Sequence, residues 1–137
     1  MSPDAARLAD TRAWLSKAQT DVRCARMSRR ADPPILEDAL FHCQQACEKA
    51  LKAFLAWHDV PFRKTHSLEE VGEQCLRIDP SLGAIIDAAV PLTEFAWAYR
   101  YPGEPEEPEP ASVDQAIDTT VALVGAILDR LPAALRS

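Results

Sequence analysis

The sequence predicts an all-α fold, an up-and-down four-helix bundle with an additional short helix. Four long segments carry apolar residues at alternating steps of three and four, which is the spacing of one face of an α-helix. The chain of 137 residues holds only 4 glycines but 11 prolines, a balance that favours helices separated by proline-bearing turns. The sequence carries no β-hairpin signal. Its length suits one domain, which we expect over residues 1–137 with a core at residues 8–131.

The first two helices have clear boundaries in the sequence. Ser2 is a typical N-cap, and Pro3 suits the first helical position, where the missing N–H is not needed. Asp-Pro-Pro at residues 32–34 ends the first helix, because the residue before a proline is pushed out of the α region. The second helix is predicted over residues 35–58. Its apolar stripe consists of Leu36, Leu40, Cys43, Cys47, Ala50 and Phe54, and a flanking face of small residues predicts packing on two sides.

The next two helices are shorter or interrupted. Ser67 and Glu70 form a capping-box pattern that opens a short helix over residues 68–78. A further helix begins near Ser81 and carries apolar residues at heptad spacing. Pro91 lies inside that pattern and predicts a kink or a brief interruption, because proline removes a helical hydrogen bond.

An acidic, proline-rich loop is predicted at residues 102–111. It contains four prolines and four glutamates, a composition that suits neither a helix nor a central strand. Ser112 and Gln115 form a second capping-box pattern, which predicts that the last helix opens there and ends near Pro132.

The charge balance argues against a generally cationic surface. Fifteen basic residues against 21 acidic ones give a net charge of −6, whereas a free-standing nucleic-acid binder usually has a basic footprint. Four of the negative charges fall in the predicted loop, so the rest of the chain lies near −2 (−6 plus 4). Contact with nucleic acid through a local patch therefore stays open, and Arg23, Arg26, Arg29 and Arg30 form the best basic patch, with a solvated helix end as the alternative.

The apolar segments, the cysteines and the binding motifs of the sequence indicate the cellular compartment and the need for a cofactor. No segment approaches the ~18 consecutive apolar residues that cross a bilayer, and the N-terminus has no signal-peptide pattern, so we expect a cytoplasmic protein without membrane contact. The four cysteines fit a reducing compartment and are interpreted as core thiols, with a metal site as the alternative. The sequence has no glycine-rich phosphate loop and no zinc-ligand spacing. We therefore expect neither a metal nor a cofactor.

Three motifs stand out from this background. They are FHCQQACEKALKA at residues 41–53, HSL at residues 66–68 and AYRYP at residues 98–102, and Asp21 adds an acidic position in the first helix. In combination these residues resemble the HEPN domain, named for its occurrence in eukaryotic and prokaryotic nucleotide-binding proteins. The resemblance covers about residues 8–131.

The resemblance implies a helical bundle that forms a homodimer. Small bacterial HEPN proteins are often encoded beside a minimal nucleotidyltransferase as a two-gene toxin–antitoxin system, which implies such a partner and a nucleotide or RNA ligand. Many HEPN proteins are metal-independent RNases with an Arg-x(4–6)-His motif, in which the histidine acts as an acid/base group and the arginine stabilises charge on phosphate.

This sequence departs from the RNase motif. After Arg100, the positions that require a histidine hold Pro105, Glu106 and Glu107, and no arginine stands at the matching distance before any histidine. We therefore predict a non-enzymatic HEPN module that binds a nucleotide or a partner protein. One alternative is a diverged RNase that uses Arg100 with His42 or His66, and another is a purely structural helical adaptor.

Six residues are the candidates for binding, and five of them have a structural alternative. Their side chains are cationic, aromatic or able to exchange a proton: Arg100, Tyr101, His42, Lys49, Lys52 and Asp21. Arg100 and Tyr101 suit a phosphate and a stacked base, or simply the end of a helix. His42 suits a proton carrier or a packing histidine, and the two lysines suit a phosphate site or a solvated face.

Overall fold

The computed structural model describes residues 2–99, 102 and 107–136, and these residues form an all-helical protein without strands. The α-helices of this part are α1 (Pro3–Arg30), α2 (Leu36–Trp57), α3 (Leu68–Ile78), α4 (Gly83–Ala89), α5 (Leu92–Ala98) and α6 (Pro110–Asp129). Two short 3₁₀ turns, η1 (Pro80–Leu82) and η2 (Ala133–Leu135), complete them. The predicted all-α class is confirmed.

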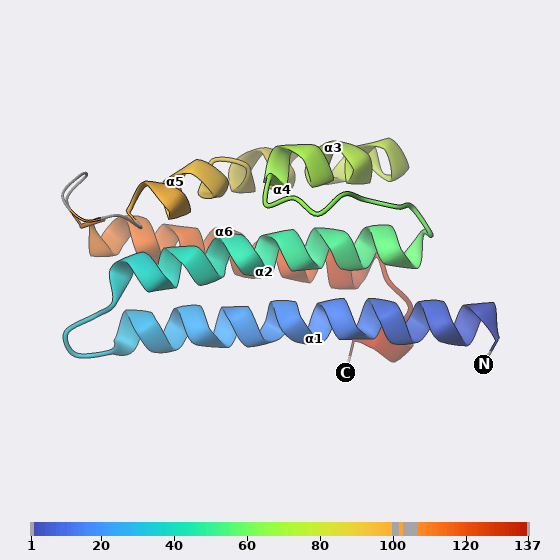
Figure 1. The fold of residues 1–137 in the computed structure, drawn as a ribbon, viewed down its shortest axis with the longest axis horizontal. Coiled ribbons are helices and arrows are strands. Elements are labelled where there is room, and N and C mark those ends of the chain that lie inside the picture. The colour runs from blue at the N-terminus through green and yellow to red at the C-terminus, as the bar shows by residue number, and fades with distance from the viewer. Residues whose placement is uncertain (1, 100–101, 103–106, 137) are drawn as a thin grey trace.

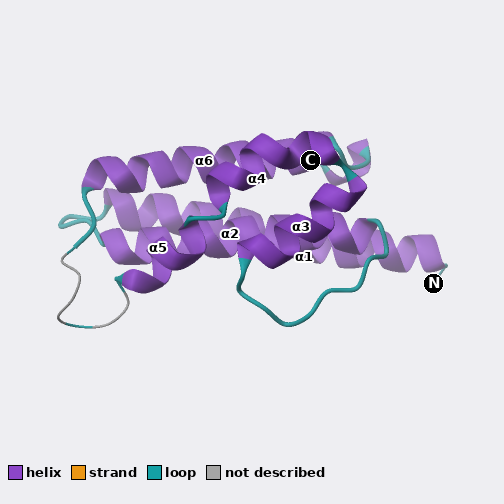
Figure 2. Ribbon diagram, turned by 90° about the horizontal axis from the view of Figure 1, so that it is seen from above, coloured by secondary structure: helices purple, strands orange, loops and turns teal. Residues whose placement is uncertain are grey.

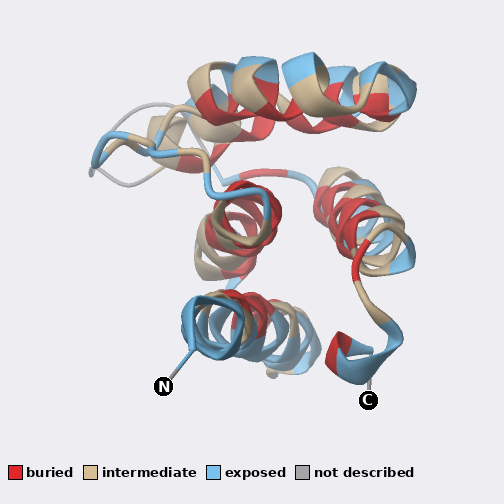
Figure 3. Ribbon diagram, turned by 90° about the vertical axis from the view of Figure 1, so that its right-hand side faces the viewer, coloured by how far each residue is buried: buried red, intermediate tan, exposed pale blue. Residues whose placement is uncertain are grey.

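The helices form the predicted up-and-down bundle (Figure 1). Helix α1 and the consecutive pair α4 and α5 run in one direction, whereas α2 and α6 run in the other. Residues 58–67, which connect α2 to α3, run back along α2 before α3 begins (Figure 2). Seen from one end, α2 lies between α1 on one side and the layer of α3, α4 and α5 on the other (Figure 3).

Helix α2 is the centre of the core. It packs against α1, α3, α5 and α6, and 15 of its 22 residues are buried. The small residues of its flanking face, Ala39, Ala46 and Ala53, are all completely buried, which confirms the prediction that this helix packs on two sides. A helix buried almost all round must satisfy every polar side chain within the protein.

The predicted helix ends agree with the structure in most cases. The Ser2 hydroxyl accepts a hydrogen bond from the Ala5 amide at 3.1 Å, and the Ser67 hydroxyl accepts one from the Glu70 amide at 3.2 Å. The Glu70 carboxylate does not return to the cap, because it forms an ion pair with Arg63 instead. The predicted interruption at Pro91 separates α4 from α5.

The predicted start of the last helix is wrong. Helix α6 begins at Pro110 rather than after Ser112, and its N-cap residue Glu109 makes no side-chain cap. Proline is well suited to the first turn because its φ is preset and its missing N–H has no helical partner. Residues 110 and 111 of the predicted loop are therefore helical, while residues 107–109 are not.

The cysteines of the described chain are free thiols, and three of them belong to the core. Cys43, Cys47 and Cys75 are completely buried. Burial raises the pKa of Cys43 to about 11, and a hydrogen bond to Thr120 partly opposes this rise. It likewise raises the pKa values of Cys47 and Cys75 to about 12. Thiols with such pKa values stay protonated at neutral pH and pack as small apolar side chains.

Helix α6 has the length and apolar composition of a membrane-crossing helix, alone among the helices of the described residues. A core helix of a soluble protein passes the same test. The apolar face of α6 contains Val113, Leu123 and Ile127, which are completely buried, and the helix packs against α1, α2 and α4. The most apolar window of α6 is 33% buried, so the core covers one side of this helix and leaves the rest of its surface outside the core.

We predict that Gly72→Ala destabilises the protein although alanine is the better helix former. A Cβ at residue 72 lies 2.7 Å from Cγ2 of Ile86, so the Ile86 side chain or the two helices must shift to make room. The expected loss in the free energy of unfolding is about 1 kcal/mol, the overpacking cost less the gain in helix propensity. Urea denaturation measures it, with Gly83→Ala as the control, because a Cβ there meets only Leu76 at an ordinary 3.9 Å. Equal stability of the two variants contradicts the prediction.

Candidate functional site

The first cluster of charged side chains joins α1 to α2. The Asp21 carboxylate on α1 lies 2.8 Å from Nδ1 of His42 and 2.6 Å from the Lys49 ammonium, both on α2. His42 and Lys49 are two helical turns apart and therefore share the face that α1 covers. Only 9% of the Asp21 side chain is exposed, so its charge depends on these partners.

A neighbouring carboxylate holds the other side of the His42 ring. Nε2 of His42 lies 3.5 Å from Asp38, one turn earlier on α2. The Ser28 hydroxyl of α1 donates to the same Asp38 oxygen at 2.6 Å. Both ring nitrogens thus face carboxylates inside the contact between two helices, which is the environment of a packing histidine.

The second cluster lies deeper along α2. The Glu48 carboxylate is 3.1 Å from the Lys52 ammonium and 2.9 Å from Nδ1 of His66. The side chains of Glu48 and Lys52 are only 4% and 7% exposed. Lys52 also donates to the backbone carbonyl of Thr65 at 3.1 Å. Its ammonium lies 5.5 Å from the ring centroid of Trp14, a distance at which an aromatic face attracts a cation.

Two glutamines extend this second cluster. Gln44 donates to the backbone carbonyl of His66 at 2.7 Å, and Gln45 donates to the Gln44 side chain at 2.7 Å. Together with Lys52, they fix the connection between α2 and α3 against the centre of the bundle. Sequence reasoning did not name Gln44 or Glu48 as site residues. The signal that points to Glu48 is Lys52, which stands four residues later and so lies on the same face of the helix.

His66 is the exposed member of the second cluster. Its side chain is 63% exposed, while the carboxylate that holds its Nδ1 is buried. Its ring lies 5.9 Å from the Trp97 ring near the end of α5. Among the residues that the structure describes, Nε2 of His66 has no partner.

The structure thus groups the predicted site residues in two places. Asp21, His42 and Lys49 come together in the first cluster, whereas Lys52 belongs to the second. Arg100 and Tyr101 lie outside the described residues. Neither lysine is a solvated cation, because each donates to a carboxylate of the fold. No group of three potential metal ligands occurs in the described ranges.

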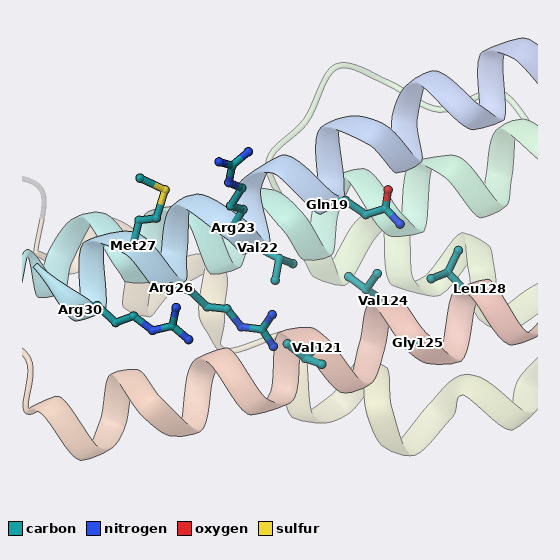
Figure 4. A pocket seen from close by; sticks show the side chains of 10 residues that line it. All are labelled: Gln19, Val22, Arg23, Arg26, Met27, Arg30, Val121, Val124, Gly125 and Leu128. Atoms are coloured by element: carbon teal, nitrogen blue, oxygen red, sulfur yellow. The ribbon is translucent and has the colours of Figure 1, made fainter. Parts of the chain in front are cut away.

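The basic patch of α1 lies beside a groove between α1 and α6. Arg29 of this patch is paired within the fold, because it donates two hydrogen bonds to the Asp114 carboxylate at 2.7 and 3.2 Å. Arg23, Arg26 and Arg30 line the groove, which has a volume of about 660 Å³ (Figure 4). None of these three has a salt bridge to a described residue.

The fold and its polar clusters define an all-α bundle whose central helix carries buried ion pairs. The family model for the HEPN domain matches residues 11–130, and the chain belongs to the HEPN domain family. The match includes both polar clusters and the groove. No curated protein and no solved structure is similar enough to the chain to give a match.

We predict that Lys52 stabilises the fold. Lys52→Met leaves the buried Glu48 carboxylate without its cation and should lower the free energy of unfolding by about 3 kcal/mol. The double variant Glu48→Gln/Lys52→Met removes both charges and should recover most of that loss. Lys64→Met is the control on an exposed lysine, expected to change stability by less than about 0.5 kcal/mol. Denaturant titration of the wild type and the three variants measures the free energies of unfolding. A Lys52→Met variant as stable as the Lys64→Met variant contradicts the prediction.

Proposed function

We propose that the chain is a non-catalytic HEPN module that binds a partner protein, as one component of a HEPN/nucleotidyltransferase system. The observation that carries the proposal is the neutralisation of the α2 lysines inside the bundle. Lys49 donates to Asp21, and Lys52 donates to Glu48 and to a backbone carbonyl. A phosphate that recruited either ammonium group would have to displace a buried carboxylate, which costs several kcal/mol.

A cluster of arginines without salt bridges to described residues lies elsewhere, on the groove between α1 and α6. Five of the ten residues that line this groove are large and apolar, namely Val22, Met27, Val121, Val124 and Leu128. None of the ten is aromatic, so the groove offers no platform for stacking a base. A surface that combines apolar side chains with arginines is typical of protein interfaces, where arginine is enriched. These features favour a protein over a nucleotide as the ligand.

The first test is complex formation with the product of the adjacent gene, which the proposal expects to be a minimal nucleotidyltransferase. The two chains, co-expressed with a tag on one, should co-purify and migrate as one species in size-exclusion chromatography with light scattering. The same measurement on the chain alone tests the proposed homodimer. Millimolar ATP should leave the melting temperature of the chain alone unchanged. Absence of the complex, or degradation of added RNA by the purified chain, contradicts the proposal.

One geometry favours a second candidate function, a diverged RNase. The buried Glu48 carboxylate orients the exposed His66 ring through Nδ1 and leaves Nε2 without a described partner. In the neutral tautomer with the proton on Nδ1, Nε2 retains the lone pair that a general base requires. The exposed Glu69 and Glu94, which line a hollow beside Trp97, count against an RNA backbone there.

The RNase candidate predicts that the chain expressed without its partner arrests growth and degrades cellular RNA. His66→Ala and Arg100→Ala should each abolish both effects, whereas His58→Ala should keep them, because His58 lies at the exposed end of α2. Melting curves of the three variants establish that each is folded. Normal growth and intact RNA with the wild-type chain exclude this candidate and leave the binding module.

A further inference from the structure

We propose that the groove between the C-terminal halves of α1 and α6 binds an acidic amphipathic helix of a partner protein. This inference rests on the proposed function, because it names the surface and the chemistry of the partner. It depends on three independent features of the groove: exposed apolar side chains, arginines without a salt bridge to a described residue, and a glycine that no contact of the described fold requires.

Apolar exposure in the described chain is concentrated at this groove. Three large apolar side chains are exposed in the described chain, namely Met27, Ile35 and Val121, and two of them, Met27 at 60% and Val121 at 38%, line the groove. In Figure 4, Val22 of α1 points towards α6, where Val121 and Val124 lie across the groove, so apolar side chains of the two helices face each other. An apolar trough between two helices suits the apolar face of a third helix.

The arginines at the groove provide a charge pattern for the polar face of that helix. Arg23, Arg26 and Arg30 follow one another at steps of three and four, and Arg23 and Arg30 are about 10 Å apart along the axis of α1. The same spacing brings carboxylates at positions i, i+3 and i+7 of a partner helix onto one face. Arginine suits this role because its planar guanidinium forms two parallel hydrogen bonds to a carboxylate.

Gly125 lies in the C-terminal half of α6, among the residues that line the groove. A Cβ built at this residue meets nothing within 4 Å, in contrast to Gly72, so no contact in the described fold requires a glycine there. Glycine inside a helix is less favourable than alanine, because it loses more backbone freedom on folding. The missing side chain exposes the α6 backbone to the groove, and small residues at such positions allow another helix to approach closely.

The same features favour an acidic helix over two other ligands of the groove, a second copy of the chain and an RNA strand. A second copy of the chain that docks the same groove symmetrically places two sets of arginines against each other, and no carboxylate lines the groove. An RNA strand finds no aromatic side chain among the lining residues and approaches a chain with a net charge of −6. An acidic amphipathic helix satisfies the arginines and covers Val121 and Met27.

The test uses two fluorescein-labelled helical peptides with the same leucine seam. One carries glutamates at positions i, i+3 and i+7 beside the seam, and the other carries lysines at these positions. Fluorescence anisotropy with the full chain should show saturable binding of the glutamate peptide, and at least tenfold weaker binding of the lysine peptide. Arg26→Glu should weaken the glutamate peptide at least tenfold, whereas Arg77→Glu on α3, away from the groove, should leave its affinity unchanged.

Gly125→Leu separates binding from stability. Because the site is open and leucine is a good helix former, the variant should melt about 2–4 °C higher than the wild type. Its side chain should nevertheless fill the groove and weaken the glutamate peptide at least tenfold. Equal binding of both peptides, no saturable binding of the glutamate peptide, or full affinity in the Gly125→Leu variant overturns the proposal.

Two further measurements identify the other occupants and separate this inference from the proposed function. A wild-type dimer that Gly125→Leu converts to monomer assigns the groove to self-association, and displacement of the glutamate peptide by a short single-stranded RNA assigns it to RNA. Either result overturns the proposal. If the complex with the adjacent gene product forms with the wild type and survives Gly125→Leu, the groove assignment fails while the partner-binding function stands. If the wild type forms no complex, the function itself fails.

Discussion

The burial of ionised groups along α2 is the constraint on which the rest of the structure depends. Glu48 and Asp21 are carboxylates with almost no contact with solvent, and such groups are tolerated only when cations and hydrogen bonds compensate them. Each carboxylate is met by one lysine and one histidine. Because the partners come from different elements, these pairs fix how α1 and the α2–α3 connection lie on α2. Removal of one partner of such a pair is costly because it leaves a buried charge, whereas replacement of the whole pair by apolar residues is often neutral in stability.

The structure also shows why some parts were predictable from the sequence and others were not. The helices follow from local signals, such as the spacing of apolar residues, the Ser67 cap and the interruption at Pro91. The start of α6 was missed because two local signals compete there, and Pro110 at the first helical position prevailed over the cap pattern at Ser112. Both kinds of signal act within a few residues, so errors at helix ends leave the bundle itself unaffected.

The polar clusters could not be predicted in the same way. Periodicity places Lys49 and Lys52 on α2, but their partners are chosen by tertiary structure: Asp21 is 28 residues away from Lys49, and His66 is 18 residues away from Glu48. A lysine on a helix has the same local pattern whether it is solvated, binds a phosphate or is buried beside a carboxylate. Only the burial of the side chain and the position of the second chain segment distinguish these cases.

The charged residues of α1 lie on two faces of the helix and have different roles. Asp21, Ala25 and Ser28 form the buried face that meets α2, whereas Arg23, Arg26 and Arg30 follow the opposite edge and make no salt bridge within the described chain. The buried ion pairs between α1 and α2 contribute to the stability of the fold, because removal of one partner leaves a buried ion. The three arginines contribute little to the stability of the fold and remain available to a ligand. Since the helical period keeps the two sets apart on a single rigid element, a partner can bind at the groove without disturbing the ion pairs that hold α1 in place.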